Sequence, residues 1–141
     1  MNGKSSKIAM ITILAGLLVC AYPVFVLGYT WIHVARAKLP GGRGGPLDAY
    51  RHTLASAVVA YTTDKRAVDW VSRIMERGGS GSNEMDRRNN GIGASIGLRA
   101  RTFSEIEPAV LEAIQGGAEN ATSPDRITWL SRDHWHDRLF W

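Results

Sequence analysis

Residues 86–97 read DRRNNGIGASIG, and this stretch sets how the helices of the chain meet. Asp86, Asn90, Gly93 and Gly97 recur at helical spacing. They therefore form one stripe that is polar at its start and has no side chains at its end. A glycine inside a helix costs about 1 kcal/mol relative to alanine. The glycines of this stretch predict that another backbone packs closely against the helix, as small residues four apart allow.

A second polar pair, Asp48 and His52, lies earlier in the chain and is also one helical turn apart. If the helix that carries it crosses the glycine stripe, His52 meets Asp86 and Asn90. A carboxylate beside an imidazole fixes its tautomer and raises its basicity, which is what a general base needs.

These relations give the candidate catalytic residues. His52 is the expected general base, and Asp86 orients its ring. Arg51 is the expected stabiliser of an anionic intermediate. Asn90 completes the set.

Two other interpretations of the same residues remain open. In the first, Asp48, His52, Asp86 and Asn90 ligate a divalent cation as two pairs on facing helices, in the manner of bundle metal sites. Oxygen ligands with a single histidine favour Mg²⁺, Mn²⁺ or Ca²⁺ over copper. In the second, the residues form a hydrogen-bonded network that only locks two helices together.

The N-terminal third of the chain has the composition of a membrane span. Residues 8–35 contain no Lys, Arg, Asp or Glu, and a spanning helix needs about 20 apolar residues. Tyr29 and Trp31 suit the aromatic belt of a membrane interface. We expect an uncleaved transmembrane anchor over 8–35 after a short tail, 1–7, with a cleaved signal peptide as the alternative.

The rest of the chain is expected to form a tether and one domain. Residues 36–46 are rich in Gly and Pro and predict a flexible link. Residues 47–141 predict a small all-α domain of four to five helices, because helical periodicity recurs and strand alternation does not. The expected helices cover residues 46–62, 65–77, 83–101 and 104–115, with a short final helix or turn in 127–141. Ser104 and Glu107 are read as a capping box for the fourth of these.

Charge and cysteine content limit the function classes. Residues 39–141 hold 13 basic and 13 acidic side chains, so the domain lacks the basic footprint of a nucleic-acid-binding protein. The excess positive charge flanks the apolar run and suits anionic lipids. The single cysteine, Cys20, lies inside that run, which excludes disulfides in the domain. The expected partners are the lipid bilayer and other envelope proteins, without nucleic acid.

The two polar signatures also carry a family resemblance. The chain has Arg51-His52 and then Asp86-x-x-Asn89-Asn90-x-x-Gly. This pattern resembles an uncharacterised bacterial all-α domain family with an Arg-His motif and an Asp-x-x-Asn-Asn-x-x-Gly motif. That family occurs in secreted or surface proteins and at toxin-like C-termini. The resemblance covers residues 47–100 and implies that these five polar residues act together.

One position departs from the family pattern. The family often carries His-Glu near the end of the intervening helix, where this chain has Met75-Glu76. The departure puts one ligand or base in doubt. The family has no settled activity that the resemblance implies for this chain.

Two functions follow as expectations. One is a membrane-anchored accessory protein of a bacterial envelope machine of the secretion or conjugation type. The other is a small membrane-tethered hydrolase that uses His52 as general base on lipid, cell wall or peptide, with a divalent cation as a candidate cofactor. We expect single-pass insertion in the bacterial inner membrane with the domain in the periplasm.

Overall fold

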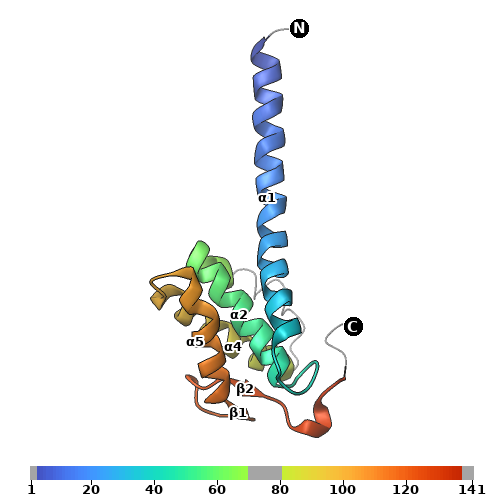
Figure 1. Cartoon of the computed structure of the whole chain (residues 1–141), viewed down its shortest axis with the longest axis vertical. Coiled ribbons are helices and arrows are strands. Elements are labelled where there is room, and N and C mark those ends of the chain that lie inside the picture. Colours follow the sequence, from blue (N-terminus) through green and yellow to red (C-terminus); the bar gives the residue numbers. More distant parts are fainter. Residues whose placement is uncertain (1–2, 70–80, 138–141) are drawn as a thin grey trace.

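The computed structural model describes residues 3–69 and 81–137, as one long helix whose C-terminal half joins a small helical domain (Figure 1). The expectation of an all-α domain is confirmed, because the strands are only two residues long each. Residues 65–69 are also helical. The elements in chain order are α1 (Gly3–Arg36), α2 (Pro46–Thr62), α4 (Gly81–Arg99), η1 (Phe103–Glu105), α5 (Ile106–Gln115), β1 (Ala118–Glu119), β2 (Thr128–Trp129) and η2 (Arg132–His134).

Helix α2 is the centre of the domain and contacts α1, α4, α5 and β2. Pro46 occupies its first turn, where a missing N–H costs no helical hydrogen bond. Its residues Tyr50, Leu54 and Val58 recur at helical spacing and are fully buried. The apolar stripe of this one helix therefore supplies much of the core.

Helix α4 touches α2 backbone to backbone. A Cβ added to Gly93 would lie 2.2 Å from the carbonyl oxygen of Thr53, and one added to Gly97 would lie 2.1 Å from that of Ala57. Any side chain at these two positions would force the helices apart. The close approach predicted from the glycine stripe is therefore confirmed, at two points one helical turn apart.

The C-terminal half of α1 belongs to the domain core. Val26, Thr30 and Val34 lie four residues apart and are at most 7% exposed, and the Tyr22 hydroxyl lies 2.6 Å from Thr62 Oγ1. The helix is long and apolar enough to cross a membrane. The segment expected as an anchor, 8–35, therefore has two parts. Its first part is free of the domain, and from Tyr22 onward the helix packs against the domain.

The Gly/Pro segment is packed rather than free, which corrects the expectation of a flexible tether. Leu130 N–H donates to the Gly44 carbonyl at 2.9 Å, and His136 N–H donates to the Arg43 carbonyl at 3.0 Å. A Cβ on Gly41 would lie 2.8 Å from the Trp135 ring, and the φ of Gly41 is +80°. The C-terminal segment therefore packs against this link and is hydrogen-bonded to it. Gly41 is required where the Trp135 ring approaches its backbone.

The final segment contains η2, a short 3-10 helix that agrees with the short helix or turn expected in 127–141. It also contains β2, because its backbone pairs with β1. One local expectation is wrong. The capping box does not form, because η1 precedes α5 and the Glu105 carboxylate accepts a hydrogen bond from Arg101 N–H at 2.8 Å. Most of the helix expected over 65–77, including Met75 and Glu76, lies outside the described residues.

The glycine contact predicts opposite effects of alanine at two neighbouring positions. Gly97→Ala places a methyl group against the Ala57 carbonyl, so we expect a loss of about 3 kcal/mol or more in unfolding free energy. Gly91→Ala meets no described atom within 4 Å, so we expect a gain of up to about 1 kcal/mol. Urea unfolding of the full chain in detergent, followed by circular dichroism, measures both. Equal effects of the two substitutions would contradict the backbone contact.

The shared core predicts where the chain tolerates truncation. A fragment that starts at residue 22 keeps the α1 face that covers α2, whereas one that starts at residue 40 exposes that apolar surface to water. We expect cooperative thermal unfolding for 22–141 and a broad, low-temperature transition for 40–141. Cooperative melting of both fragments at the same temperature would show that α1 is not part of the core.

Candidate functional site

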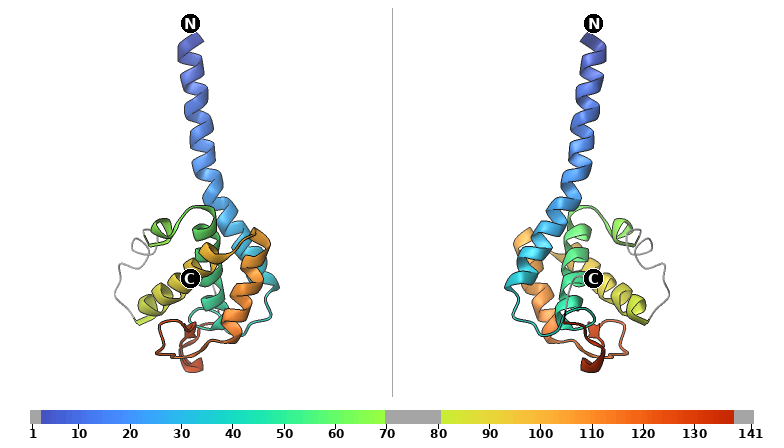
Figure 2. Two further views of the ribbon diagram at one scale, coloured as in Figure 1. Left: turned by 90° about the vertical axis from the view of Figure 1, so that its left-hand side faces the viewer. Right: turned by 90° about the vertical axis from the view of Figure 1, so that its right-hand side faces the viewer.

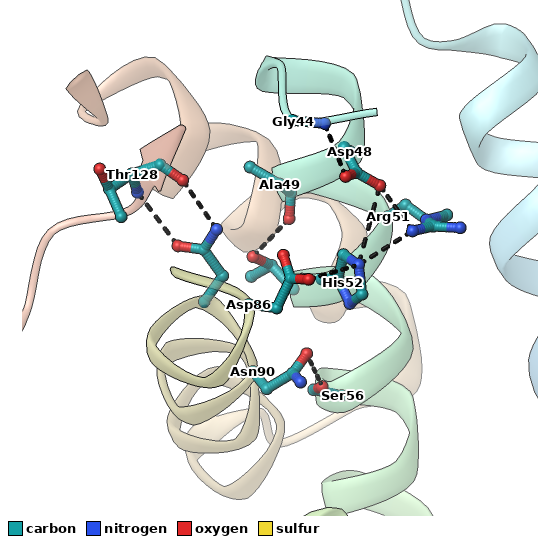
Figure 3. A network of polar contacts seen from close by, with 11 residues as sticks. Gly44, Asp48, Ala49, Arg51, His52, Ser56, Asp86, Asn90 and Thr128 are labelled. Carbon is teal, nitrogen blue, oxygen red and sulfur yellow. Dashed lines mark hydrogen bonds and ion pairs between the residues drawn. The ribbon is translucent and has the colours of Figure 1, made fainter. Parts of the chain in front are cut away.

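The polar residues of the two signatures meet where α2 crosses α4 (Figure 3). His52 Nε2 lies 3.7 Å from Asp48 Oδ1 on its own helix and 3.6 Å from Asp86 Oδ2 on α4. The glycine contact begins one residue further along α2, at Thr53, so the close helix approach is what brings the His52 and Asp86 side chains together. We call Asp48, Arg51, His52 and Asp86 the His/Asp centre.

Asp48 is held by two partners and is almost fully buried, with 3% of its side chain exposed. The Gly44 backbone N–H donates to Asp48 Oδ2 at 2.8 Å. Arg51 Nη2 lies 2.6 Å from Asp48 Oδ1, and the Arg51 guanidinium lies 5.9 Å from the centre of the Trp31 ring, within reach of a cation–π interaction. The link and α1 therefore both support the centre.

The protonation of His52 follows from its neighbour. Arg51 Nη2 lies 2.9 Å from His52 Nε2, and a guanidinium only donates. His52 Nε2 must therefore accept this hydrogen bond, which requires a neutral ring protonated at Nδ1. Arg51 therefore occupies the Nε2 lone pair, while carboxylate oxygens of Asp48 and Asp86 lie 3.7 and 3.6 Å from the same nitrogen.

The pKa of His52 agrees with a neutral ring. Burial, reinforced by the positive charge of Arg51, lowers this pKa to about 4. Asp48 and a hydrogen bond with the Asn90 side chain act in the opposite direction and are outweighed. The imidazole is consequently neutral at physiological pH, and its basicity is lowered rather than raised as the carboxylate neighbour predicts. This favours a role as a ligand over that of a general base.

Asn90 lies directly below the centre, one turn along α4 from Asp86. Its Oδ1 accepts a hydrogen bond from Ser56 Oγ at 2.8 Å, and the residue is 8% exposed. This contact crosses from α4 to α2, as the contact of Asp86 with His52 does. The structure therefore brings together all of the residues expected at the site from the residue pattern: Asp48, Arg51, His52, Asp86 and Asn90.

Asn89, which the family resemblance groups with them, has a different neighbour. Its Nδ2 donates to the Thr128 carbonyl at 2.8 Å, and its Oδ1 accepts from Thr128 N–H at 3.0 Å. The side chain is fully buried and completes the backbone hydrogen bonding of β2 in the way a paired strand would. Asn89 thus fastens the C-terminal segment to α4 and does not contact His52.

The centre has the spacing of a cation site. One ligand atom each from Asp48, His52 and Asp86 lies within 4.8 Å of the other two. Ligands bound at about 2.0–2.6 Å around one divalent cation lie about 3–5 Å from each other. In the structure the guanidinium of Arg51 contacts two of these three groups, Asp48 and His52.

Two surface hollows of the described residues lie away from His52. One is bounded by Glu84, Arg88 and Trp129. The other is bounded by Pro40, Arg132 and Trp135. Neither includes a member of the His/Asp centre, which lies at the crossing of α2 and α4.

No protein-family model, no curated protein and no solved structure matches this chain. The functional argument therefore depends on the geometry of the His/Asp centre and on its position relative to α1.

Two supporting residues were missed by the sequence reasoning. Trp31 was interpreted as a membrane-interface residue, and Gly44 as part of a flexible link. The spacing of Val26, Thr30 and Val34 marks a helix face with a polar residue inside an apolar run, and this signal indicates packing against protein. Nothing in the pattern around Gly44 predicts its hydrogen bond to Asp48.

The lowered pKa of His52 predicts a pH-dependent stability. The ring is neutral in the fold, whereas in the unfolded chain it takes up a proton near pH 6.5. The contribution of His52 is therefore fully present above pH 6.5 and is lost as pH falls toward 4. We expect the unfolding free energy to fall by about 3 kcal/mol over this range, and urea unfolding at several pH values measures it.

Two variants make this measurement specific. His52→Gln should flatten the dependence of the unfolding free energy on pH between pH 6.5 and pH 4. His136 is exposed, and His136→Gln should leave this dependence unchanged. A wild-type slope that persists in His52→Gln would assign the effect to other groups.

Proposed function

We propose that this chain is a single-pass protein of the bacterial inner membrane whose periplasmic domain is a hydrolase that depends on a divalent cation. The apolar N-terminal half of α1 supports the anchor, since Ile8, Ile11 and Leu14 are among its exposed side chains. We place the domain that follows this anchor in the periplasm as part of the proposal. The family resemblance to secreted and surface proteins agrees with this placement.

The observation that carries the proposal is the convergence of three electron-pair donors. Asp48 and Asp86 offer carboxylate oxygens, and His52 offers the Nε2 lone pair, from two helices that the glycine contact holds in fixed positions. Such a preorganised set favours a cation, because three donors facing each other repel unless a positive charge lies between them. Two carboxylates with one imidazole suit Mg²⁺ or Mn²⁺.

The chemistry follows from the charges around that cation. Asp48, His52 and Asp86 would hold the cation, which would act as a Lewis acid and lower the pKa of water bound to it. Arg51 would be displaced from Asp48 by the cation, because like charges repel at this distance. The displaced guanidinium would then be free to stabilise an anionic intermediate, which fits hydrolysis of lipid, cell wall or peptide beside the membrane.

A second candidate function has its own supporting observation. Arg51 already pairs with Asp48 and bonds His52, and Arg43 adds a further positive charge near the ring. In this form the His/Asp centre is a closed network that fixes α2 on α4. The domain would then be a rigid accessory module of an envelope machine, of the secretion or conjugation type, that binds other envelope proteins.

Removal of the built-in cation separates the two candidates. Arg51→Gln leaves the carboxylates of Asp48 and Asp86 facing the His52 lone pair, so we expect a lower melting temperature of the full chain in detergent with EDTA. If the centre binds cations, millimolar Mn²⁺ should raise the melting temperature of Arg51→Gln by several degrees. The double variant Arg51→Gln/Asp86→Asn should not respond.

The other outcome favours the accessory protein. If Mn²⁺, Mg²⁺ and Ca²⁺ leave the melting temperature of wild type and of Arg51→Gln unchanged, the centre is a packing network and the hydrolase proposal fails. Where Mn²⁺ does bind, release of products from bacterial lipid or cell-wall preparations by the loaded chain tests hydrolysis itself. Asp86→Asn is the negative control for that assay.

A further inference from the structure

The length of α1 that is free of the domain is short for a bilayer. Fourteen residues, 8–21, separate Lys7 from Tyr22, and at 1.5 Å per residue they cover about 21 Å. The hydrocarbon core of a bilayer is about 30 Å thick. If α1 is the anchor of the proposed function, the part of the domain that surrounds Tyr22 must therefore reach the bilayer surface.

Contacts identify which part of the domain lies at this level. Tyr22 meets Thr62 at the end of α2. The Phe103 ring, in the turn after α4, lies 6.0 Å from the ring of Phe25 and 4.9 Å from that of Tyr29. The ends of α2 and α4 therefore lie beside α1 where it enters the domain (Figure 2). We call residues 61–66 and 98–103 the rim.

Aromatic rings gather at this level. Tyr61 joins the cluster, with its ring centre 5.7 Å from that of Phe103. Phe25 is 44% exposed, and Leu27, half a turn further on, is 56% exposed. Aromatic and apolar side chains at one height along a membrane helix are typical of the boundary between hydrocarbon and head groups.

The rim also presents free positive charge. The side chains of Arg66, Arg99 and Arg101 are exposed, and no hydrogen bond or ion pair among the described residues engages their guanidinium groups. The nearby carboxylates are occupied within the chain: Asp69 pairs with Lys65, Asp64 Oδ1 accepts from Ala67 N–H, and Glu105 accepts from Arg101 N–H. Leu98 stands among these arginines and is 54% exposed.

We propose that the rim rests on the membrane that anchors α1, with Arg66, Arg99 and Arg101 bound to phosphates of anionic lipids and Leu98 inserted among the head groups. The arginines act as donors to phosphate oxygens, and an anionic surface attracts basic residues that lie near it. The free part of α1 is shorter than the hydrocarbon core of a bilayer. If α1 crosses the membrane, the rim must therefore contact the bilayer surface, and for this reason we identify the bilayer as its binding partner. The domain is thereby fixed in one orientation to the membrane.

Depth-dependent fluorescence quenching tests the proposal on the full chain. Single cysteines in a Cys20→Ala background carry a bimane label at Leu98→Cys, at Ile13→Cys within the anchor, and at Glu119→Cys in β1 at the far end of the domain (Figure 1). The chain is placed in nanodiscs that contain phosphatidylglycerol and brominated lipid. We expect the brominated lipid to quench the fluorescence of bimane at positions 98 and 13, and we expect no quenching at position 119.

Charge variants and a second lipid make the result specific. Arg99→Glu/Arg101→Glu should reduce quenching at 98 by at least half, and Arg132→Glu, in η2 away from the rim, should not. Quenching at position 98 should also be weaker in nanodiscs whose head groups are phosphatidylcholine alone, because these lipids carry no net negative charge. Quenching at 13 without quenching at 98 would overturn the rim proposal and indicate that the surface serves a protein partner. Loss of quenching at 13 would instead overturn the anchor of the proposed function.

Discussion

The rest of the structure depends on one constraint, the contact of two helix backbones at Gly93 and Gly97. These glycines lie against the carbonyl oxygens of Thr53 and Ala57, where no Cβ fits. The conformational cost of glycine in a helix is offset by dispersion contacts that only such a close approach allows. The same approach brings His52 of one helix to Asp86 of the other. Packing and candidate chemistry therefore share one cause.

The His/Asp centre is assembled from segments that lie far apart in the sequence. Trp31 of α1 lies over Arg51, and the Gly44 amide binds Asp48. The link that carries Gly44 is itself held by the C-terminal segment, through Leu130. A displacement of α1 relative to the domain would therefore reach Asp48 and Arg51 directly.

Local patterns predicted more of this protein than its long-range contacts. The stripe from Asp86 to Gly97 predicted both the helix and its close partner, because a 3.6-residue period and the absence of side chains are visible in the sequence. The packing of α1 on the domain was not predicted, since an apolar run suits lipid and protein equally. Asn89 was assigned to the centre by resemblance, but on α4 it points to Thr128. Adjacent residues of a helix face different directions, and only the position of β2 decides what each one meets.

The helix crossing holds His52 as a neutral ring between two carboxylates and Arg51. Nitrogen-15 NMR of the imidazole, recorded on the full chain in detergent micelles as a function of pH, reports this protonation state. We predict that His52 stays neutral and protonated at Nδ1 down to about pH 4, because burial and Arg51 lower its pKa. A ring that takes up a proton near pH 6.5, or that carries its proton on Nε2 at neutral pH, would contradict the account.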